Sequence, residues 1–155
     1  MGNSNLNKIN QFLVLGNPVH LNFKEKNLFG KSNLGAHVCR CLIVLVLAED
    51  VVSKKKPDPE IYLLALKKAG LKLEECIVIE DSRNGVPAAS AADMHIVATT
   101  NCCTEKEDLS DADIIVTCLG DPDGEKATLK KADQELDFDG VLHVDRFLEY
   151  FSKAN

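Results

Sequence analysis

The sequence lacks the features that would connect it to a membrane or a nucleic acid. It has no run of 18 or more apolar residues, and a membrane-spanning helix needs about 20 in a row, so we expect no membrane span. The formal net charge is −6, which would repel a phosphate backbone, so we expect no nucleic-acid partner. A Gly-rich P-loop and a G-x-G-x-x-G motif are both missing, which argues against nucleotide binding by those routes.

The cysteines show no pattern typical of a zinc site. None forms a C-x-x-C pair, and no second cluster has zinc-ligand spacing. We therefore expect reduced thiols and a cytoplasmic protein, with zinc binding and disulfides as the alternatives. Residues 1–24 contain no Asp or Glu, as in a transit peptide, but they also contain no arginine and a single serine, so a plastid location is the alternative. The six cysteines are Cys39, Cys41, Cys76, Cys102, Cys103 and Cys118.

The first 37 residues differ in character from the rest of the chain. They are rich in Asn, Gly and Lys and show no sustained hydrophobic period, which favours an irregular leader. One short apolar stretch, Phe12 to Leu15, could form a strand. We expect the folded domain to comprise residues 38–155, a length sufficient for a hydrophobic core.

Strand-like and helix-like segments alternate after residue 40. The first helix is expected to have Asp58 as its N-cap, Pro59 at its first position and Gly70 as its stop. Alternation with short connections predicts an α/β fold with a parallel sheet covered by helices. The expected strands are 41–47, 76–79, 94–100 and 113–119; the expected helices are 59–69, 85–93 and 143–153; residues 121–140 are charged and turn-rich.

Two adjacent carboxylates follow a buried strand. Glu80 and Asp81 come directly after residues 76–79, and ligands of open α/β sheets bind beyond the carboxyl ends of strands. Adjacent carboxylates suit a hard cation such as Mg²⁺, bound together with waters and phosphate oxygens. The alternative is that they are ordinary turn or helix-cap residues.

Lys56 is the third of three consecutive lysines and precedes Pro57. The proline favours an extended backbone at Lys56 and launches a helix, which could aim the ammonium group at the sheet edge that carries Glu80 and Asp81. There it would neutralise charge on a phosphoryl group. The alternative is a solvated surface lysine, which is our interpretation of Lys54 and Lys55.

Together these segments resemble the haloacid dehalogenase superfamily of phosphohydrolases, in its CbbY-like or β-phosphoglucomutase-like branch. The resemblance rests on "KPDP" from Lys56 and on "VIEDSRNGVPAASAADM" from Val78, and it covers residues 41–120. It implies a three-layer Rossmann-like fold. It also implies a Mg²⁺-dependent phosphatase or phosphomutase in which an aspartate attacks phosphorus and forms an aspartyl-phosphate, with a phosphorylated small molecule such as a sugar phosphate as substrate.

The resemblance also implies roles for individual residues. Lys56 would be catalytic and would hold the phosphate and the nucleophile. Glu80 and Asp81 would be the metal-side carboxylates, and Ser82 would lie against the substrate in the same loop.

Half of the family's site is missing from the pattern. The family's nucleophile belongs to a D-x-D-G motif after an N-terminal strand, but residues 1–40 contain no aspartate. Its second motif and its cap domain are also not recognisable. The nucleophile strand is central in the family's sheet, so we expect a gap that "FLVLG" fills, a loose protein, or a partner chain that completes the sheet.

One later segment, Asp137 to Val141, spells the missing motif as "DFDGV". The preceding residues, "KKADQE", are too charged for a buried strand, so the segment is interpreted as a turn, with a permuted active enzyme as the alternative. The sequence thus predicts a phosphohydrolase chain that is catalytically impaired by itself. A non-catalytic binding or interaction module on the same scaffold is the alternative function.

Overall fold

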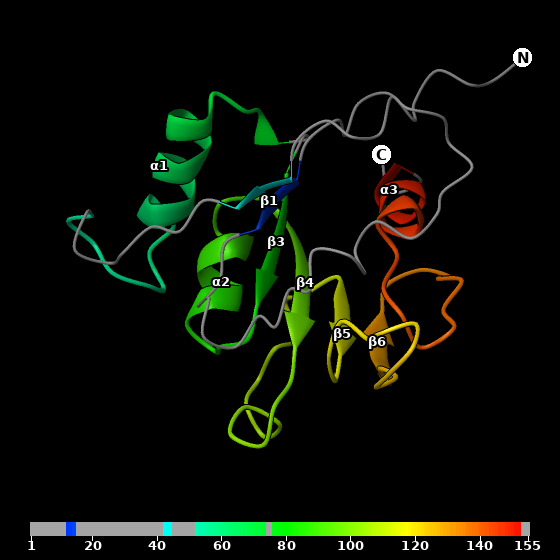
Figure 1. Cartoon of the computed structure of the whole chain (residues 1–155). Coiled ribbons are helices and arrows are strands. Elements are labelled where there is room, and N and C mark those ends of the chain that lie inside the picture. The colour runs from blue at the N-terminus through cyan, green and yellow to red at the C-terminus, as the bar shows by residue number, and fades with distance from the viewer. Residues whose placement is uncertain (1–11, 15–41, 45–51, 74–75, 153–155) are drawn as a thin grey trace, which may run out of the picture.

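The computed structural model describes residues 12–14, 42–44, 52–73 and 76–152 (Figure 1). In chain order the elements are β1 (Phe12–Val14), β2 (Leu42–Val44), α1 (Glu60–Ala69), β3 (Ile77–Glu80), α2 (Gly85–Ser90), β4 (His95–Thr99), β5 (Ile114–Val116), β6 (Leu129–Ala132) and α3 (Val144–Ser152). In these ranges no helix is both long enough and apolar enough to span a membrane.

The main sheet has four strands in the order β3-β4-β5-β6. The first three strands are parallel, as predicted, with Ile79 opposite Val97 and Val97 opposite Ile114. The fourth strand, β6, pairs antiparallel with β5, so the sheet is mixed. The predicted parallel sheet is therefore found in β3, β4 and β5, and β6 adds an antiparallel strand at this edge, in a segment that was expected to be turn-rich.

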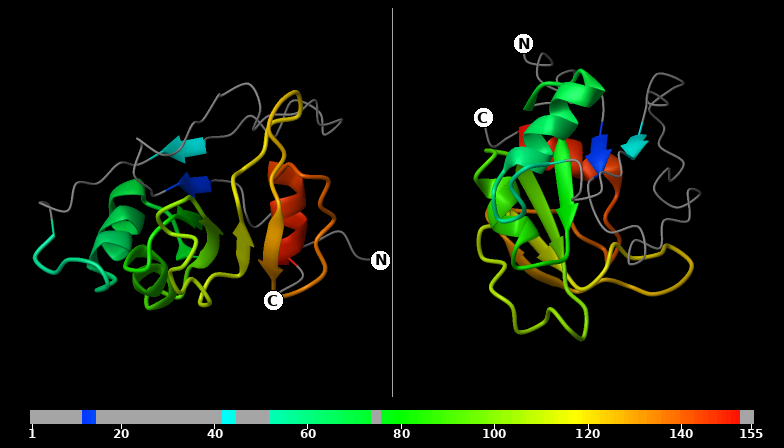
Figure 2. Two further views of the ribbon diagram at one scale, coloured as in Figure 1. Left: turned by 90° about the horizontal axis from the view of Figure 1, so that it is seen from below. Right: turned by 90° about the vertical axis from the view of Figure 1, so that its left-hand side faces the viewer.

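Helices cover both faces of this sheet. Val78 and Ile96 lie in one buried cluster with residues of α1 and α2, whereas Ile77 and Val97 lie in a second cluster with residues of α3. Neighbouring residues of a strand point to opposite faces, so the two clusters occupy the two sides of the sheet. Figure 2 shows α2 and α3 on those two sides. The three-layer α/β architecture is confirmed.

Helix α1 begins one residue later than predicted. Its N-cap is Pro59, which makes no side-chain cap hydrogen bond. The Asp58 carboxylate still satisfies a backbone donor at this end, because its Oδ1 accepts a 3.0 Å hydrogen bond from the N–H of Glu60. At the other end Gly70 has φ of 67° and its N–H bonds to the Leu66 carbonyl, as a glycine stop should.

The other predicted elements agree with the structure to within a few residues, except that residues 41 and 45–47 of the predicted strand 41–47 lie outside the described residues. Strand β3 extends one residue beyond its predicted end, so that Glu80 is its last residue and not the first residue of the loop. As the last residue of the strand, Glu80 is buried.

Strands β1 and β2 form a separate parallel pair, with Leu13 opposite Ile43. β1 lies against β3 (Figure 1), but it is hydrogen-bonded in the sheet of β2 and not in that of β3. The three alternatives for the expected gap stay open, because β1 contacts β3 without joining its sheet. The rest of the predicted leader, residues 1–11 and 15–37, lies outside the described residues, and the domain boundary at residue 38 stays a prediction.

Candidate functional site at the carboxyl end of β3

The site is built around Glu80, the last residue of β3. Its side chain is buried, with 2% of its surface exposed, and a buried carboxylate is costly unless it is paired and hydrogen-bonded. Oε1 accepts hydrogen bonds from the Lys56 ammonium and the Tyr62 hydroxyl. Oε2 lies 3.3 Å from both the Asp81 N–H and the Ser82 hydroxyl. Both carboxylate oxygens therefore have partners within the protein.

Lys56 reaches this carboxylate from the segment that precedes α1. The structure thus brings together two residues that are 24 positions apart in the chain and were singled out from the sequence. The Lys56 side chain keeps 19% of its surface exposed, so the ammonium lies at the boundary between the interior and solvent. By contrast, Lys54 is exposed and pairs with Asp58 at 3.5 Å, and Lys55 is exposed too, as predicted for a solvated pair.

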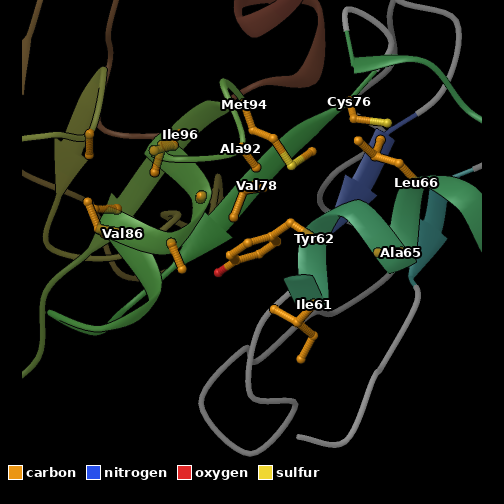
Figure 3. Close-up of a cluster of buried hydrophobic side chains, with 14 of the residues drawn as sticks. Ile61, Tyr62, Ala65, Leu66, Cys76, Val78, Val86, Ala92, Met94 and Ile96 are labelled. Carbon is orange, nitrogen blue, oxygen red and sulfur yellow. The ribbon is translucent and has the colours of Figure 1, made fainter. Parts of the chain in front are cut away.

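Tyr62, on α1, completes the environment of this ion pair. Its side chain is fully buried, its ring lies 5.2 Å from the Lys56 Nζ, and its hydroxyl also lies 3.2 Å from the Gly85 carbonyl oxygen. Figure 3 shows the ring reaching from α1 toward Val78 of β3. Burial raises the pKa of Tyr62 well above its ordinary range, and the charge of Glu80 adds to the effect, so the hydroxyl remains a hydrogen-bond donor.

Gly85 allows the Glu80 carboxylate to lie against the start of α2. A Cβ atom at this position would lie 2.0 Å from Glu80 Oε2 and 2.2 Å from its carboxyl carbon, closer than non-bonded atoms can approach. The requirement for glycine here is therefore one of space.

Ser82 links the carboxylate to α2. Its hydroxyl accepts a 3.0 Å hydrogen bond from the Gly85 N–H, and its carbonyl accepts bonds from the N–H groups of Gly85 and Val86. These bonds satisfy backbone donors at the helix start, which otherwise have no partner. Asp81 is half-buried beside it. The substrate contact expected of Ser82 stays a prediction.

The two carboxylates fit part of a magnesium shell. Mg²⁺ takes about six oxygen ligands and commonly keeps several waters beside one or two carboxylates and substrate phosphates. Among the described residues, no three His, Cys, Asp or Glu side chains are grouped so that they could hold a metal ion. Asp81 and Glu80 are thus at most two ligands of such a shell, and the Glu80 oxygens are already hydrogen-bonded.

Two residues of the site, Tyr62 and Gly85, were not identified as such from the sequence. Tyr62 falls in the predicted helix 59–69 and is buried on α1, but the sequence gave no sign of the partner of its hydroxyl group. Gly85 was interpreted as the start of a helix. Only the three-dimensional proximity of both residues to Glu80 reveals their part in the site.

The "DFDGV" segment lies in irregular structure between β6 and α3. Asp139 Oδ1 accepts a 3.2 Å hydrogen bond from the Val141 N–H, and its Oδ2 pairs with Arg146 at 3.3 Å. Asp137 is exposed and pairs with Arg146 at 3.5 Å. This geometry agrees with the turn that the sequence favoured; whether Asp137 reacts stays untested.

A family model described as "Hydrolase: haloacid dehalogenase-like hydrolase" matches residues 13–93, more than half of the chain. The chain belongs to this family. The match spans Lys56, the Glu80-Asp81 pair and the last two residues of β1.

Relatives of this haloacid dehalogenase-like chain place it in the CbbY-like branch. It is 44% identical over 86 residues to a CBBY-like protein of Arabidopsis thaliana. It is 42% identical over 69 residues to the protein CbbY of Rhodobacter capsulatus, and 37% identical over 76 residues to hexitol phosphatase A of Escherichia coli. These matches cover 56%, 44% and 49% of this chain. The chain spans only 27%, 30% and 34% of the lengths of those relatives.

Proposed function

We propose that this chain binds the phosphoryl group of a phosphorylated small molecule, such as a sugar phosphate, at Lys56. The observation that carries the proposal is the ion pair between Lys56 and the buried Glu80 at the carboxyl end of β3, the edge where α/β proteins bind ligands. The name of one relative, hexitol phosphatase A, supports a phosphorylated substrate of this class.

The proposed division of labour follows from the hydrogen bonds. Glu80 orients Lys56, and Tyr62 in turn orients Glu80, so the ammonium is held in place before a ligand arrives. Such preorganised charge stabilises the negative oxygens of a phosphoryl group. Ser82 lies next to Glu80 and would contribute a hydroxyl to the same ligand.

We further propose that Asp81, with Glu80 beside it, forms the protein's side of a Mg²⁺ site. Bound Mg²⁺ would neutralise charge on the phosphoryl oxygens. Asp81 is the better placed of the two, because it is half-buried while Glu80 is enclosed by Lys56 and Tyr62.

Catalysis requires a nucleophile, and residues 1–40 contain no aspartate. We therefore propose that the chain binds phosphate but hydrolyses phosphoesters poorly or not at all, since the aspartyl-phosphate route lacks its usual carboxylate. The same observation favours the second candidate function, a non-catalytic binding module on a phosphohydrolase scaffold.

One experiment separates these possibilities. We would measure inorganic phosphate binding by calorimetry with and without Mg²⁺, together with hydrolysis of para-nitrophenyl phosphate. We expect phosphate binding that Lys56→Ala weakens at least tenfold and that the matched surface variant Lys54→Ala leaves unchanged. Equal affinity in the two variants would refute the assigned role of Lys56.

The hydrolysis assay distinguishes the impaired or non-catalytic chain from the permuted enzyme. No turnover above buffer, together with phosphate binding, would support the impaired or non-catalytic chain. Mg²⁺-dependent turnover lost in both Asp81→Asn and Asp137→Asn would instead support the permuted enzyme and refute the proposed impairment.

The cytoplasmic location, with a plastid as the alternative, and a partner chain that completes the sheet are also proposals. Fractionation of cells that express the full chain tests the first, and its mass in solution tests the second.

A further inference from the structure

A turn directly after β4 presents two adjacent cysteines to solvent. The Asn101 side chain fixes this turn, because its Oδ1 accepts hydrogen bonds from the N–H groups of Cys103 (2.8 Å) and Thr104 (3.0 Å). The Thr104 hydroxyl accepts a 3.0 Å bond from the Asn101 N–H in return. A backbone bond of 2.9 Å from the Glu105 N–H to the Asn101 carbonyl closes the turn. The backbone that carries the two thiols is therefore ordered.

The two thiols face each other. Cys102 and Cys103 are both exposed and free, and their Sγ atoms lie 3.7 Å apart. This hydrogen-bonded contact raises the pKa of the Cys103 thiol. The other two described cysteines differ from this pair. Cys76 is buried, and Cys118 is half-buried against the second buried cluster, which contains residues of α3.

The spacing suits a single soft ion between the sulfurs. Two thiolates on one tetrahedral ion with metal–sulfur bonds of about 2.3 Å lie roughly 3.8 Å apart. A pyramidal trivalent metalloid has a narrower angle and would draw the two sulfurs slightly closer together. Soft thiolate ligands select soft ions over Mg²⁺ or Ca²⁺. Two linked thiols also hold such an ion more strongly than two separate ones, because the second bond forms within one molecule.

We propose that Cys102 and Cys103 form a bidentate site for a soft, thiophilic metal or metalloid ion of the trivalent arsenic type. With phenylarsine oxide as the probe, both S–H bonds break and two As–S bonds form. The oxide oxygen leaves with the two protons as water, and arsenic stays trivalent, so no oxidant or reductant is needed. This inference does not rest on the proposed phosphate site.

The site lies at the same sheet edge as Glu80. Strand β4 pairs with β3 so that Glu80 is opposite Ala98, and each of these two strands is followed by a loop at that edge. The two loops touch, because the Arg83 N–H donates a 2.8 Å hydrogen bond to the Glu107 carboxylate. An ion held by Cys102 and Cys103 would therefore sit on a loop that is bonded to the loop of Asp81 and Ser82.

The test uses the full chain with Cys39 and Cys41 replaced by serine, because that C-x-C pair could also capture the probe. After reduction, the protein is treated with phenylarsine oxide, and intact-mass spectrometry counts the adducts. We expect one adduct per chain that survives an excess of a monothiol and is removed by a dithiol. Cys102→Ser and Cys103→Ser should each weaken binding at least tenfold, while the matched control Cys118→Ser should not.

Retention of the monothiol-resistant adduct in either Cys102→Ser or Cys103→Ser would overturn the proposal, as would an adduct that a monothiol removes from the parent chain. Both side chains are exposed, so the serine variants should fold, and circular dichroism verifies that they do.

Discussion

At the scale of single residues, Glu80 is the point on which the candidate site depends. Its carboxylate is buried and yet has four hydrogen-bond donors around it, from Lys56, Tyr62, Asp81 and Ser82. Removing one partner of a buried ion pair leaves an uncompensated charge, which typically costs more than the pair contributes. The site is therefore expected to be sensitive to any change that displaces this carboxylate.

Gly85→Ala is the sharpest such change. The new methyl group would overlap the Glu80 carboxyl group, which is held by its donors and cannot swing away freely. We expect a loss of about 1–3 kcal/mol in the free energy of unfolding, the usual range for overpacking, measured by urea denaturation.

Gly124→Ala is the matched control for that variant. There a Cβ would lie 3.3 Å from the side chain of Asp121, in an exposed turn, and the neighbour can yield. Equal destabilisation by the two substitutions would contradict the claim that space beside Glu80 is what requires glycine at position 85.

The two halves of this residue-level site differed in how far they could be predicted. Lys56, Glu80 and Asp81 could be singled out from the sequence because they form a pattern with fixed spacing next to recognisable elements. Tyr62 and Gly85 could not, because their role depends on where α1 and α2 lie relative to β3. A tyrosine on an apolar helix face and a glycine at a helix start do not by themselves indicate which residue they contact.

At the scale of elements, α1 carries Tyr62 toward β3 and ends at Gly70. A Cβ at Gly70 would meet nothing within 4 Å, but the residue has φ of 67°, a conformation that L side chains rarely adopt. We expect Gly70→Ala to lower the free energy of unfolding by about 1 kcal/mol, since only the backbone preference is violated.

Gly70→Asn tests that explanation, because asparagine tolerates the left-handed conformation better than alanine. Denaturant unfolding should place Asn between Gly and Ala. A ranking with Asn below Ala would mean that side-chain size, and not the backbone angle, decides the cost.

Elements defined by local pattern were predicted well, and those defined by pairing were not. The apolar runs of β3, β4 and β5 and the helical spacing of α1 and α3 are visible along the sequence. Strand β6, "LKKA", contains one large apolar residue and two lysines, and it becomes a strand by pairing with β5. The boundaries moved by up to about three residues, as at β5 (predicted 113–119, observed Ile114–Val116), because hydrogen bonding, which the pattern does not encode, decides where a strand ends.

At the scale of the whole molecule, His95 connects the sheet to the layer formed by α3. Its ring lies 4.4 Å from that of Phe151, between their centroids, and burial lowers the pKa of His95 below its ordinary value of 6.5, with the nearby Asp113 opposing the shift. The unfolded chain therefore binds this proton more readily than the folded one.

The sign of the pH dependence follows. The contribution of neutral His95 to stability is fully present above pH 6.5 and is lost as the pH falls toward the lowered pKa of the folded state. We expect the free energy of unfolding to rise with pH across this window, and the rise to be smaller in His95→Gln. Urea titrations at a series of pH values measure it; an equal slope in the variant would assign the effect to other groups.

The placement of β6 bears on how the molecule behaves among its own copies. It is the last strand of the main sheet, and the outer edge of a sheet is where strands of different molecules can join. Lys130 is exposed on it and pairs with Glu105, while the Lys131 ammonium donates to the carbonyls of Ser110 and Ala112. Charged lysines on a short, antiparallel last strand make edge-to-edge aggregation unfavourable. The strand that was not predicted from the sequence therefore also disfavours self-association of the protein.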